Sequence, residues 1–256
     1  MLLVLDVGNS NTTLGLYDGN TLAQSWRLTS ERQRTVDEYG MMCRSLLHLC
    51  DLPSTTITDM AISSVVPPLD FTLFKMAEKF FNLKPLFVNT ANAGMPVLID
   101  NPSEAGSDRI VNAVAAYEKY GGPCIIVDFG TGTNFDVVSG QGEFIGGVIC
   151  PGIQISADAL FQRAARLYRV DIRHPEKVIG TSTTACLQSG LYFGSIGLVD
   201  GILERMIDEL GEKPHILATG GLASLIGKGS RLIETIDQDL TLEGLRMIYQ
   251  RNQSAE

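Results

Sequence analysis

The stretch "LLVLDVGNSNTTLGLYDGN" (residues 2–20) decides the fold, because it joins a buried strand, a turn of small residues and a returning strand. The apolar run ends at Asp6, and the residues that follow are rich in Gly, Asn and Ser. A turn without bulky side chains leaves its backbone N–H groups open, and such groups bind phosphate. Because Asp6 would repel phosphate, a cation held by this carboxylate, or by its bound water, would have to join the two.

The same pattern returns in the middle of the chain as "IIVDFGTGTNFDVVSGQG" (125–142). Asp6 and Asp128 lie 122 positions apart, and each is followed by a Gly-containing turn and a second strand. One copy alone would mean little, because Asp-x-Gly is common at strand ends. Two copies that open two halves of similar size predict an internal duplication. We therefore expect domains at 1–121 and 122–256, separated at Gly121-Gly122-Pro123.

Hydrophobic periodicity and turn residues predict similar elements in both halves. In the first half, strands are expected at 2–7, 12–17, 21–29, 59–66, 84–89 and 95–99, and helices at 37–50, 69–81 and from about 107. In the second half, three strands are expected within 124–149 and one at 215–221, with helices at 156–169, 182–210 and 240–252.

Composition excludes several classes of function. The 256 residues are 45% hydrophobic with a net charge of −9 and no basic run, which argues against binding nucleic acid or an anionic membrane. The apolar run 1–5 is too short for a signal peptide, and no apolar stretch is expected to be long enough to span a bilayer. We therefore expect a cytoplasmic protein.

Cysteine and histidine usage also excludes metal and disulfide scaffolds. Five cysteines without a C-x-x-C pair indicate buried free thiols, and three widely spaced histidines show no zinc-ligand spacing. The sequence also lacks G-x-x-x-x-G-K-[ST], so a P-loop kinase is not indicated.

A third glycine turn lies in "LATGGLA" (217–223), where a predicted strand enters Gly220-Gly221. Alone, this would be read as an ordinary strand-to-helix turn. Beside the two Asp-x-Gly turns, it indicates a nucleotide contact. The whole pattern resembles the acetate and sugar kinase, heat-shock-70 and actin superfamily. That resemblance implies an α/β fold of two duplicated ribonuclease-H-like domains, which face each other across a nucleotide cleft.

Within that superfamily, the chain resembles type III pantothenate kinases along nearly its whole length. The matching stretches are "DVGNSNT" (6–12), "ISSVVP" (62–67), "NPSEAGSDRIVNAVAA" (101–116), "DFGTGTNFD" (128–136), "GGVICPG" (146–152), "IGTSTTACLQSG" (179–190) and "ATGGLASL" (218–225). The resemblance implies transfer of the γ-phosphoryl group of ATP to the 4′-hydroxyl of pantothenate, the first step toward coenzyme A. It also implies a homodimer that uses Mg²⁺ with ATP and a monovalent cation, K⁺ or NH₄⁺.

The resemblance assigns roles to individual residues. Asp108, where a Gly-containing loop meets a helix, is implied as the proton acceptor, although such a residue can also serve only to stabilise the helix dipole. The neighbouring Arg109 suits the carboxylate of pantothenate. The implied substrate-binding residues are Ile99, Gly106, Ser107, Asp108, Arg109 and Thr183. The implied ATP-binding residues are Asp6, Val7, Gly8, Asn9, Ser10, Asn11, Thr12, Thr13, Thr131, Gly220 and Gly221. Asp128 is implied as the monovalent-cation ligand, and Asp6 as a Mg²⁺ partner through water.

Several positions depart from the family pattern. Ile99 replaces the usual pocket Tyr, "GSDR" (106–109) replaces Gly-Ala-Asp-Arg, and "GTST" (180–183) has lost the Lys of Gly-Lys-Asn-Thr. "DFGTGTN" (128–134) likewise stands for Asp-Phe-Gly-Thr-Ala-Thr-Thr. Two alternatives therefore stay open: a kinase of another small hydroxy compound, or a nucleotide-binding regulator without kinase activity. The 182–210 helix is a candidate dimer interface, or it is buried within its own domain.

Overall fold

A computed structural model describes residues 1–164 and 166–254 of the chain. It divides into two compact units, with unit 1 formed by Met1–Ala115 and Asp239–Glu256, and unit 2 by Ala116–Gln238. The division falls a few residues before the predicted boundary at 121/122. It also returns the last helix to unit 1, whereas the sequence-based prediction placed that helix in the second half. The two units are described separately.

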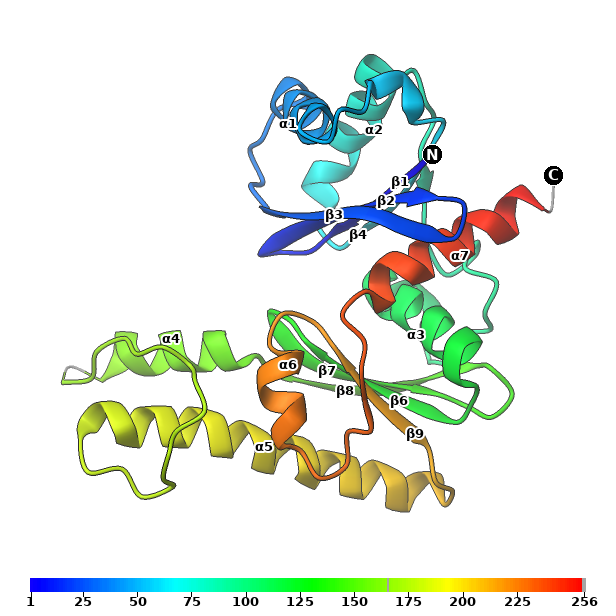
Figure 1. Cartoon of the computed structure of the whole chain (residues 1–256). Coiled ribbons are helices and arrows are strands. Elements are labelled where there is room, and N and C mark those ends of the chain that lie inside the picture. The colour runs from blue at the N-terminus through cyan, green and yellow to red at the C-terminus, as the bar shows by residue number, and fades with distance from the viewer. Residues whose placement is uncertain (165, 255–256) are drawn as a thin grey trace. The chain divides into compact units, whose positions relative to one another are not determined.

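Unit 1 contains a five-stranded sheet in the order β3-β2-β1-β4-β5 (Figure 1). Its strands are β1 (Leu2–Val7), β2 (Asn11–Asp18), β3 (Thr21–Thr29), β4 (Asp59–Ser64) and β5 (Leu86–Phe87). Its helices are α1 (Val36–His48), α2 (Pro67–Phe81), the first part of α3 (Ser107–Tyr120) and α7 (Leu240–Gln253), with single 3₁₀ turns at Ser54–Thr56 and Pro102–Glu104.

Helices cover both faces of the unit 1 sheet. Leu3 and Leu5 of β1 pack in one core with Tyr39 of α1 and Leu73 of α2. On the other face, a Cβ at Gly15 of β2 would lie 3.1 Å from the Leu242 side chain of α7. Burial on both faces explains why β1 is a nearly continuous apolar run instead of an alternating one.

Unit 2 contains a second five-stranded sheet, in the order β10-β9-β6-β7-β8. Its strands are β6 (Cys124–Phe129), β7 (Gly132–Val138), β8 (Phe144–Pro151), β9 (His215–Thr219) and β10 (Thr235–Ile236). Its helices are α4 (Ile153–Arg163), α5 (Thr183–Leu210) and the single turn α6 (Ala223–Ile226), followed by a 3₁₀ turn at Gly227–Gly229. Side chains of all three helices pack against this sheet in one core.

The two sheets have the same topology, because β6 to β10 occupy the positions of β1 to β5. In both, the first strand runs antiparallel to the second and parallel to the fourth. Asp6 pairs with Thr13 and Ser63, and Asp128 holds the equivalent position at the end of β6. The structure thus confirms the duplicated α/β fold predicted from the two Asp-x-Gly turns.

Helix α5 is the one helix of the described residues that is long and apolar enough, by length and composition, to cross a membrane. The expectation that no stretch reaches that length was therefore wrong. However, Val199 and Leu203 of α5 lie in the core of unit 2. Asp200, buried on the same helix, accepts hydrogen bonds from the Ser230 hydroxyl and from Arg231. A buried carboxylate with partners inside its own unit is typical of a packed globular helix, and we interpret α5 as one.

Three element predictions differ from the structure. Residues 95–99 form no strand apart from one isolated bridge at Val97. Helix α4 begins at Ile153 and ends at Arg163, where 156–169 was predicted, and residue 165 of that prediction lies outside the described residues. The two-residue strand β10 was not predicted, because it is too short to show a period.

Candidate active site

The loop between β1 and β2 contains the predicted phosphate-binding residues. The backbone N–H of Gly8 donates to the Asn11 carbonyl at 3.0 Å, which closes a tight turn directly after Asp6 and Val7. Thr12 is fully buried, and its hydroxyl lies 2.8 Å from that of Ser30. The loop is therefore a short turn at the carboxyl end of β1 that is stabilised by hydrogen bonds. Its remaining predicted residues, Asn9, Ser10 and Thr13, lie on the turn itself or on the first residues of β2.

Ser107 attaches the predicted substrate loop to the sheet that carries the phosphate loop. Its hydroxyl lies 3.0 Å from the hydroxyl of Ser63 and accepts a hydrogen bond from the Ser64 backbone N–H at 3.0 Å. Ser63 is fully buried on β4, where it pairs with Asp6 of β1. Because β1 and β4 are parallel neighbours, their carboxyl-terminal ends lie side by side. The start of α3 is therefore fixed at the end of the sheet where the phosphate loop begins. Unit 1 thus brings Asp108 to the same edge as Asp6.

Asp108 follows Ser107 in the first turn of α3, and its carboxylate lies against the loop. One carboxylate oxygen accepts a hydrogen bond from the Arg109 backbone N–H at 2.8 Å. A Cβ at Gly106 would lie 2.6 Å from that oxygen, so the glycine leaves the space that the carboxylate occupies. Burial raises the pKa of Asp108, and hydrogen bonding and charge from Arg109 only partly oppose this effect. A raised pKa makes this carboxylate a better proton acceptor than an exposed Asp.

The segment 101–104, before Asp108, is stabilised by hydrogen bonds between its own residues. Asn101 accepts hydrogen bonds from the backbone N–H and the hydroxyl of Ser103, and donates to Glu104 at 2.8 Å. Ile99 is half-buried in the irregular chain that precedes this turn. Arg251 and Asn252 of α7 donate to carbonyls of residues 92–94, which fixes the start of the same irregular chain to unit 1.

In unit 2, Asp128 lies against the Gly220-Gly221 turn. Gly220 has a φ of +91°, and a Cβ there would lie 2.4 Å from an Asp128 carboxylate oxygen and 2.8 Å from the Phe129 backbone. Asp128 pairs with Asn134 and with Thr219, the residue before Gly220. The structure therefore brings together two stretches that the sequence separates by about 90 positions.

Thr131 lies on the turn that follows Asp128, between β6 and β7. A Cβ at Gly152 would lie 2.2 Å from the Thr131 carbonyl oxygen, so the end of β8 packs directly on this turn. Within unit 2, Gly220 thus lies against Asp128, and Thr131 lies on the turn that follows Asp128, against Gly152.

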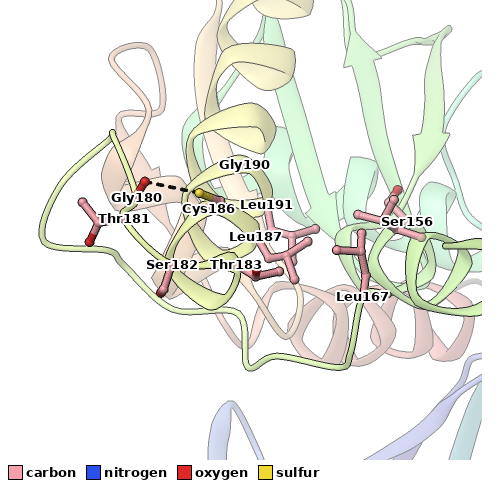
Figure 2. Close-up of a pocket in the computed structure, with 11 residues that line it drawn as sticks. Ser156, Leu167, Gly180, Thr181, Ser182, Thr183, Cys186, Leu187, Gly190 and Leu191 are labelled. Carbon is pink, nitrogen blue, oxygen red and sulfur yellow. Dashed lines mark hydrogen bonds between the residues drawn. The ribbon is translucent and has the colours of Figure 1, made fainter. Parts of the chain in front are cut away.

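Thr183 lies elsewhere in unit 2, at the start of α5. It lines a cavity of about 890 Å³ together with Ser156, Leu167, Cys186 and Leu187 (Figure 2). Neither Asp128 nor Gly220 lines this cavity. The Ser182 hydroxyl caps α5 by accepting from the Ala185 N–H. A second cavity of about 210 Å³ shares Ser156 and Leu191 with the first, so the hollow continues between α4 and α5.

The described residues contain no group of three or more His, Cys, Asp or Glu side chains that could hold a metal ion. A single carboxylate at Asp6 or Asp128 does fit a cation that takes most of its ligands from phosphate and water, as Mg²⁺ does in many kinases. All five cysteines are free, but only Cys43 and Cys124 are buried, and Cys186 is exposed. The prediction that all five thiols are buried is therefore confirmed for Cys43 and Cys124 only, since Cys50 and Cys150 are half-buried and Cys186 is exposed. Burial raises the pKa of Cys43 and of Cys124 to about 12.

Sequence reasoning missed the roles of Ser63 and Ser64. Both lie in the matching stretch "ISSVVP", but small hydroxyl residues at a strand end give no signal of their own. Their importance follows from the pairing of β4 with β1, which is a tertiary feature. Arg32 was also missed; its guanidinium donates to the Asn9 side chain of the phosphate loop at 3.2 Å.

Comparison with solved structures shows the fold. A Campylobacter jejuni protein described as a Baf family transcriptional activator has a TM-score of 0.61 at 19% identity, covering 98% of this chain and 99% of its own. The activator of the 2-hydroxyisocaproyl-CoA dehydratase from Clostridium difficile, solved with ADPNP bound, has a TM-score of 0.52 at 10% identity, covering 100% and 98%. Together with the duplicated sheets, these similarities show the fold, which is an α/β fold of two ribonuclease-H-like units.

Sequence comparison identifies the family. Residues 2–205 match the model of the type III pantothenate kinase family. A type III pantothenate kinase from Koribacter versatilis (strain Ellin345) is 57% identical over 265 residues, which cover 99% of this chain and 97% of the relative. The chain belongs to the type III pantothenate kinase family.

Proposed function

We propose that this protein transfers the γ-phosphoryl group of ATP to the 4′-hydroxyl of pantothenate, with Asp108 as the proton acceptor. Family membership supports the reaction. The main support for the role of Asp108 is the position of its neighbour Ser107. Ser107 is hydrogen-bonded to β4 at the end of the sheet where the phosphate loop begins. The raised pKa of the Asp108 carboxylate also supports this role.

ATP would contact residues of both units. In unit 1 these are residues 6–13, whose tight turn offers backbone N–H groups to phosphate oxygens. In unit 2 they are Thr131, Gly220 and Gly221, of which Gly220 lies against Asp128. Asp6 would hold Mg²⁺ through water, and Asp128 a monovalent cation, K⁺ or NH₄⁺. When bound, these cations neutralise phosphate charge.

Pantothenate would be bound by Ile99, Gly106, Ser107, Arg109 and Thr183. Arg109 would provide a guanidinium for the substrate carboxylate, and it lies on the same helical turn as Ser107, which is hydrogen-bonded to β4. Thr183 lines the cavity of unit 2, where its hydroxyl can donate to or accept from the substrate.

The proposed reaction is an in-line transfer. The 4′-oxygen of pantothenate attacks the γ-phosphorus, and the bond between that phosphorus and the β–γ bridging oxygen breaks, so that ADP leaves. The proton of the hydroxyl passes to the Asp108 carboxylate, and solvent removes it after the product has left. Positioning and electrostatic stabilisation supply most of the rate in such a reaction, and proton transfer contributes about 10²–10⁴-fold.

We further propose a cytoplasmic homodimer that assembles through unit 2. Apolar side chains on α4, α5 and the connection between them are exposed, among them Ile155, Tyr168, Val178, Ile179 and Leu198. A group of exposed apolar residues on one unit is typical of an interface. Ile179→Asp should therefore convert the dimer to monomers in sedimentation experiments. Leu49→Asp, an equally exposed apolar position in unit 1, serves as the control and should leave the dimer intact.

The deciding assay combines the protein with ATP, Mg²⁺, K⁺ and pantothenate, and measures phosphopantothenate. We expect turnover that falls by about 10²–10⁴-fold in Asp108→Asn and is largely lost when Na⁺ replaces K⁺. No phosphopantothenate from the wild-type protein would contradict the proposed substrate.

One observation favours a second candidate. Ile99 stands where the family usually has Tyr, so the pocket lacks a phenol that could donate a hydrogen bond to the acceptor. A kinase of another small hydroxy compound would phosphorylate that compound with a higher kcat/KM than pantothenate. Ile99→Tyr should then improve turnover of pantothenate only.

A further inference from the structure

Arg32 lies beside the predicted phosphate loop, held there by three contacts. β3 ends at Thr29, and the next residue, Ser30, donates its backbone N–H to the Ser10 carbonyl at 3.0 Å. The Ser30 hydroxyl also bonds to that of Thr12. Two residues further, the Arg32 guanidinium donates to the Asn9 side-chain oxygen at 3.2 Å. The segment 30–32 therefore follows the loop, and the guanidinium contacts the loop at Asn9.

The Arg32 guanidinium is available to an anion. Arg32 is exposed, and among residues 1–164 and 166–254 no carboxylate forms an ion pair with it. Its hydrogen bond to Asn9 uses one N–H, and a guanidinium has further donors arranged as a planar fork. Such a fork matches two oxygens of a phosphate group.

The charge around the phosphate loop favours a role for the Arg32 guanidinium. The chain carries a net charge of −9, and the phosphate loop begins with the carboxylate of Asp6. The only positive contributions of the loop itself are backbone dipoles. A cationic side chain beside this turn would attract a polyphosphate anion, and Arg32 is hydrogen-bonded to the turn.

Arg34, in the same segment, provides a contrast. Its guanidinium donates to the Thr29 carbonyl at 2.9 Å and lies over the ring of Tyr39, 5.3 Å from the ring centroid. Arg34 therefore stabilises the start of α1, whereas Arg32 donates to Asn9 on the phosphate loop.

We propose that Arg32 binds the phosphate groups of ATP, with Asn9 orienting its guanidinium. This inference rests on the proposed binding of ATP at residues 6–13. Arg32 acts on nucleotide affinity, and Asp108 remains the group that accepts the proton.

The test compares Arg32→Gln with Arg34→Gln in the full-length protein. Equilibrium binding of Mg²⁺–ATP and of AMP is measured by calorimetry, together with KM and kcat for ATP. We expect Arg32→Gln to weaken ATP binding by about 10- to 100-fold, the effect of one charge-assisted contact. AMP binding should change much less, and Arg32→Lys should recover part of the loss because it keeps the charge. Added salt should weaken ATP binding by the wild-type protein more than by Arg32→Gln.

Equal ATP affinity in Arg32→Gln and Arg34→Gln would overturn the proposal, as would an equal loss for ATP and AMP. Thermal unfolding of both variants separates a binding effect from a folding effect, and we expect only Arg34→Gln to lower Tm. The proposed function is judged separately. A wild-type protein that binds ATP but does not phosphorylate pantothenate would refute the substrate, while the affinity ratio would still decide the role of Arg32.

Discussion

Asp108 is subject to opposite demands from folding and from chemistry. Its burial disfavours the charged carboxylate, and this raises its pKa. The folded protein therefore retains this proton to a higher pH than the unfolded chain does. The resulting destabilisation is absent below the unfolded pKa of about 3.9 and complete above the raised folded pKa. The ionised Asp108 carboxylate can thus accept a proton in the reaction, but it lowers the free energy of unfolding.

Asp108→Asn should consequently be less active but more stable. At pH 7 we expect a higher Tm than in the wild-type protein, and the difference should shrink as the pH falls toward 4. Asp158 provides the contrast, because its hydrogen bond from Arg169 lowers its pKa. Asp158→Asn should give no gain at pH 7. Thermal unfolding between pH 4 and pH 8 measures both, and a pH-independent gain in Asp108→Asn would contradict the explanation.

A substitution at Gly220 tests whether its contact with Asp128 matters for ATP binding. Gly220→Ala would place a Cβ 2.4 Å from the Asp128 carboxylate and strain a backbone with a φ of +91°. We expect a loss of about 1–3 kcal/mol in stability and a rise in KM for ATP. Gly211→Ala is the control, because its φ of +70° is similar but nothing lies within 4 Å. It should lose stability only, and a rise in KM for ATP in both variants would refute a local role for Gly220.

At the scale of elements, Ser107 joins α3 to β4. Ser107→Ala removes the hydroxyl that contacts Ser63 and the Ser64 backbone, and it leaves a fully buried hydroxyl at Ser63 with one partner fewer. We expect a loss of about 1–3 kcal/mol in the free energy of unfolding, measured in urea. Ser103→Ala, on the exposed turn before it, should lower the free energy of unfolding by less. Equal costs would mean that the contacts of Ser107 do not hold α3 in place.

The elements also show what the sequence could and could not predict. Strands β1 and β6 were predictable, because each is an apolar run that ends in Asp-x-Gly. The contact between Asp128 and Gly220 was not, because it depends on β9 lying beside β6 in parallel pairing. The end of α4 at Arg163 was missed for a related reason. The apolar period continues past it, and local periodicity does not report where tertiary packing ends a helix.

At the scale of the whole molecule, the duplication is incomplete at the C-terminus. Helix α7 follows unit 2 in the sequence but packs on the sheet of unit 1. Gly244 permits this packing, since a Cβ there would lie 2.3 Å from the Val111 carbonyl of α3. The Thr241 hydroxyl also donates to the Asn112 side chain at 2.7 Å. The last 14-residue helix therefore completes the core of the first unit, which the sequence-based domain boundary could not show.

This arrangement predicts that core mutations in the two units act separately. Leu245 of α7 and Leu203 of α5 are both fully buried, and replacement by Ala should cost about 2–5 kcal/mol in either case. Leu245→Ala should speed hydrogen exchange in β1 and β4, although it lies more than 180 residues away in sequence. Leu203→Ala should speed exchange in β6 and β9 instead. If Leu245→Ala loosened β6 and β9 as much as β1 and β4, the assignment of α7 to unit 1 would not hold, and the chain would unfold as one cooperative body.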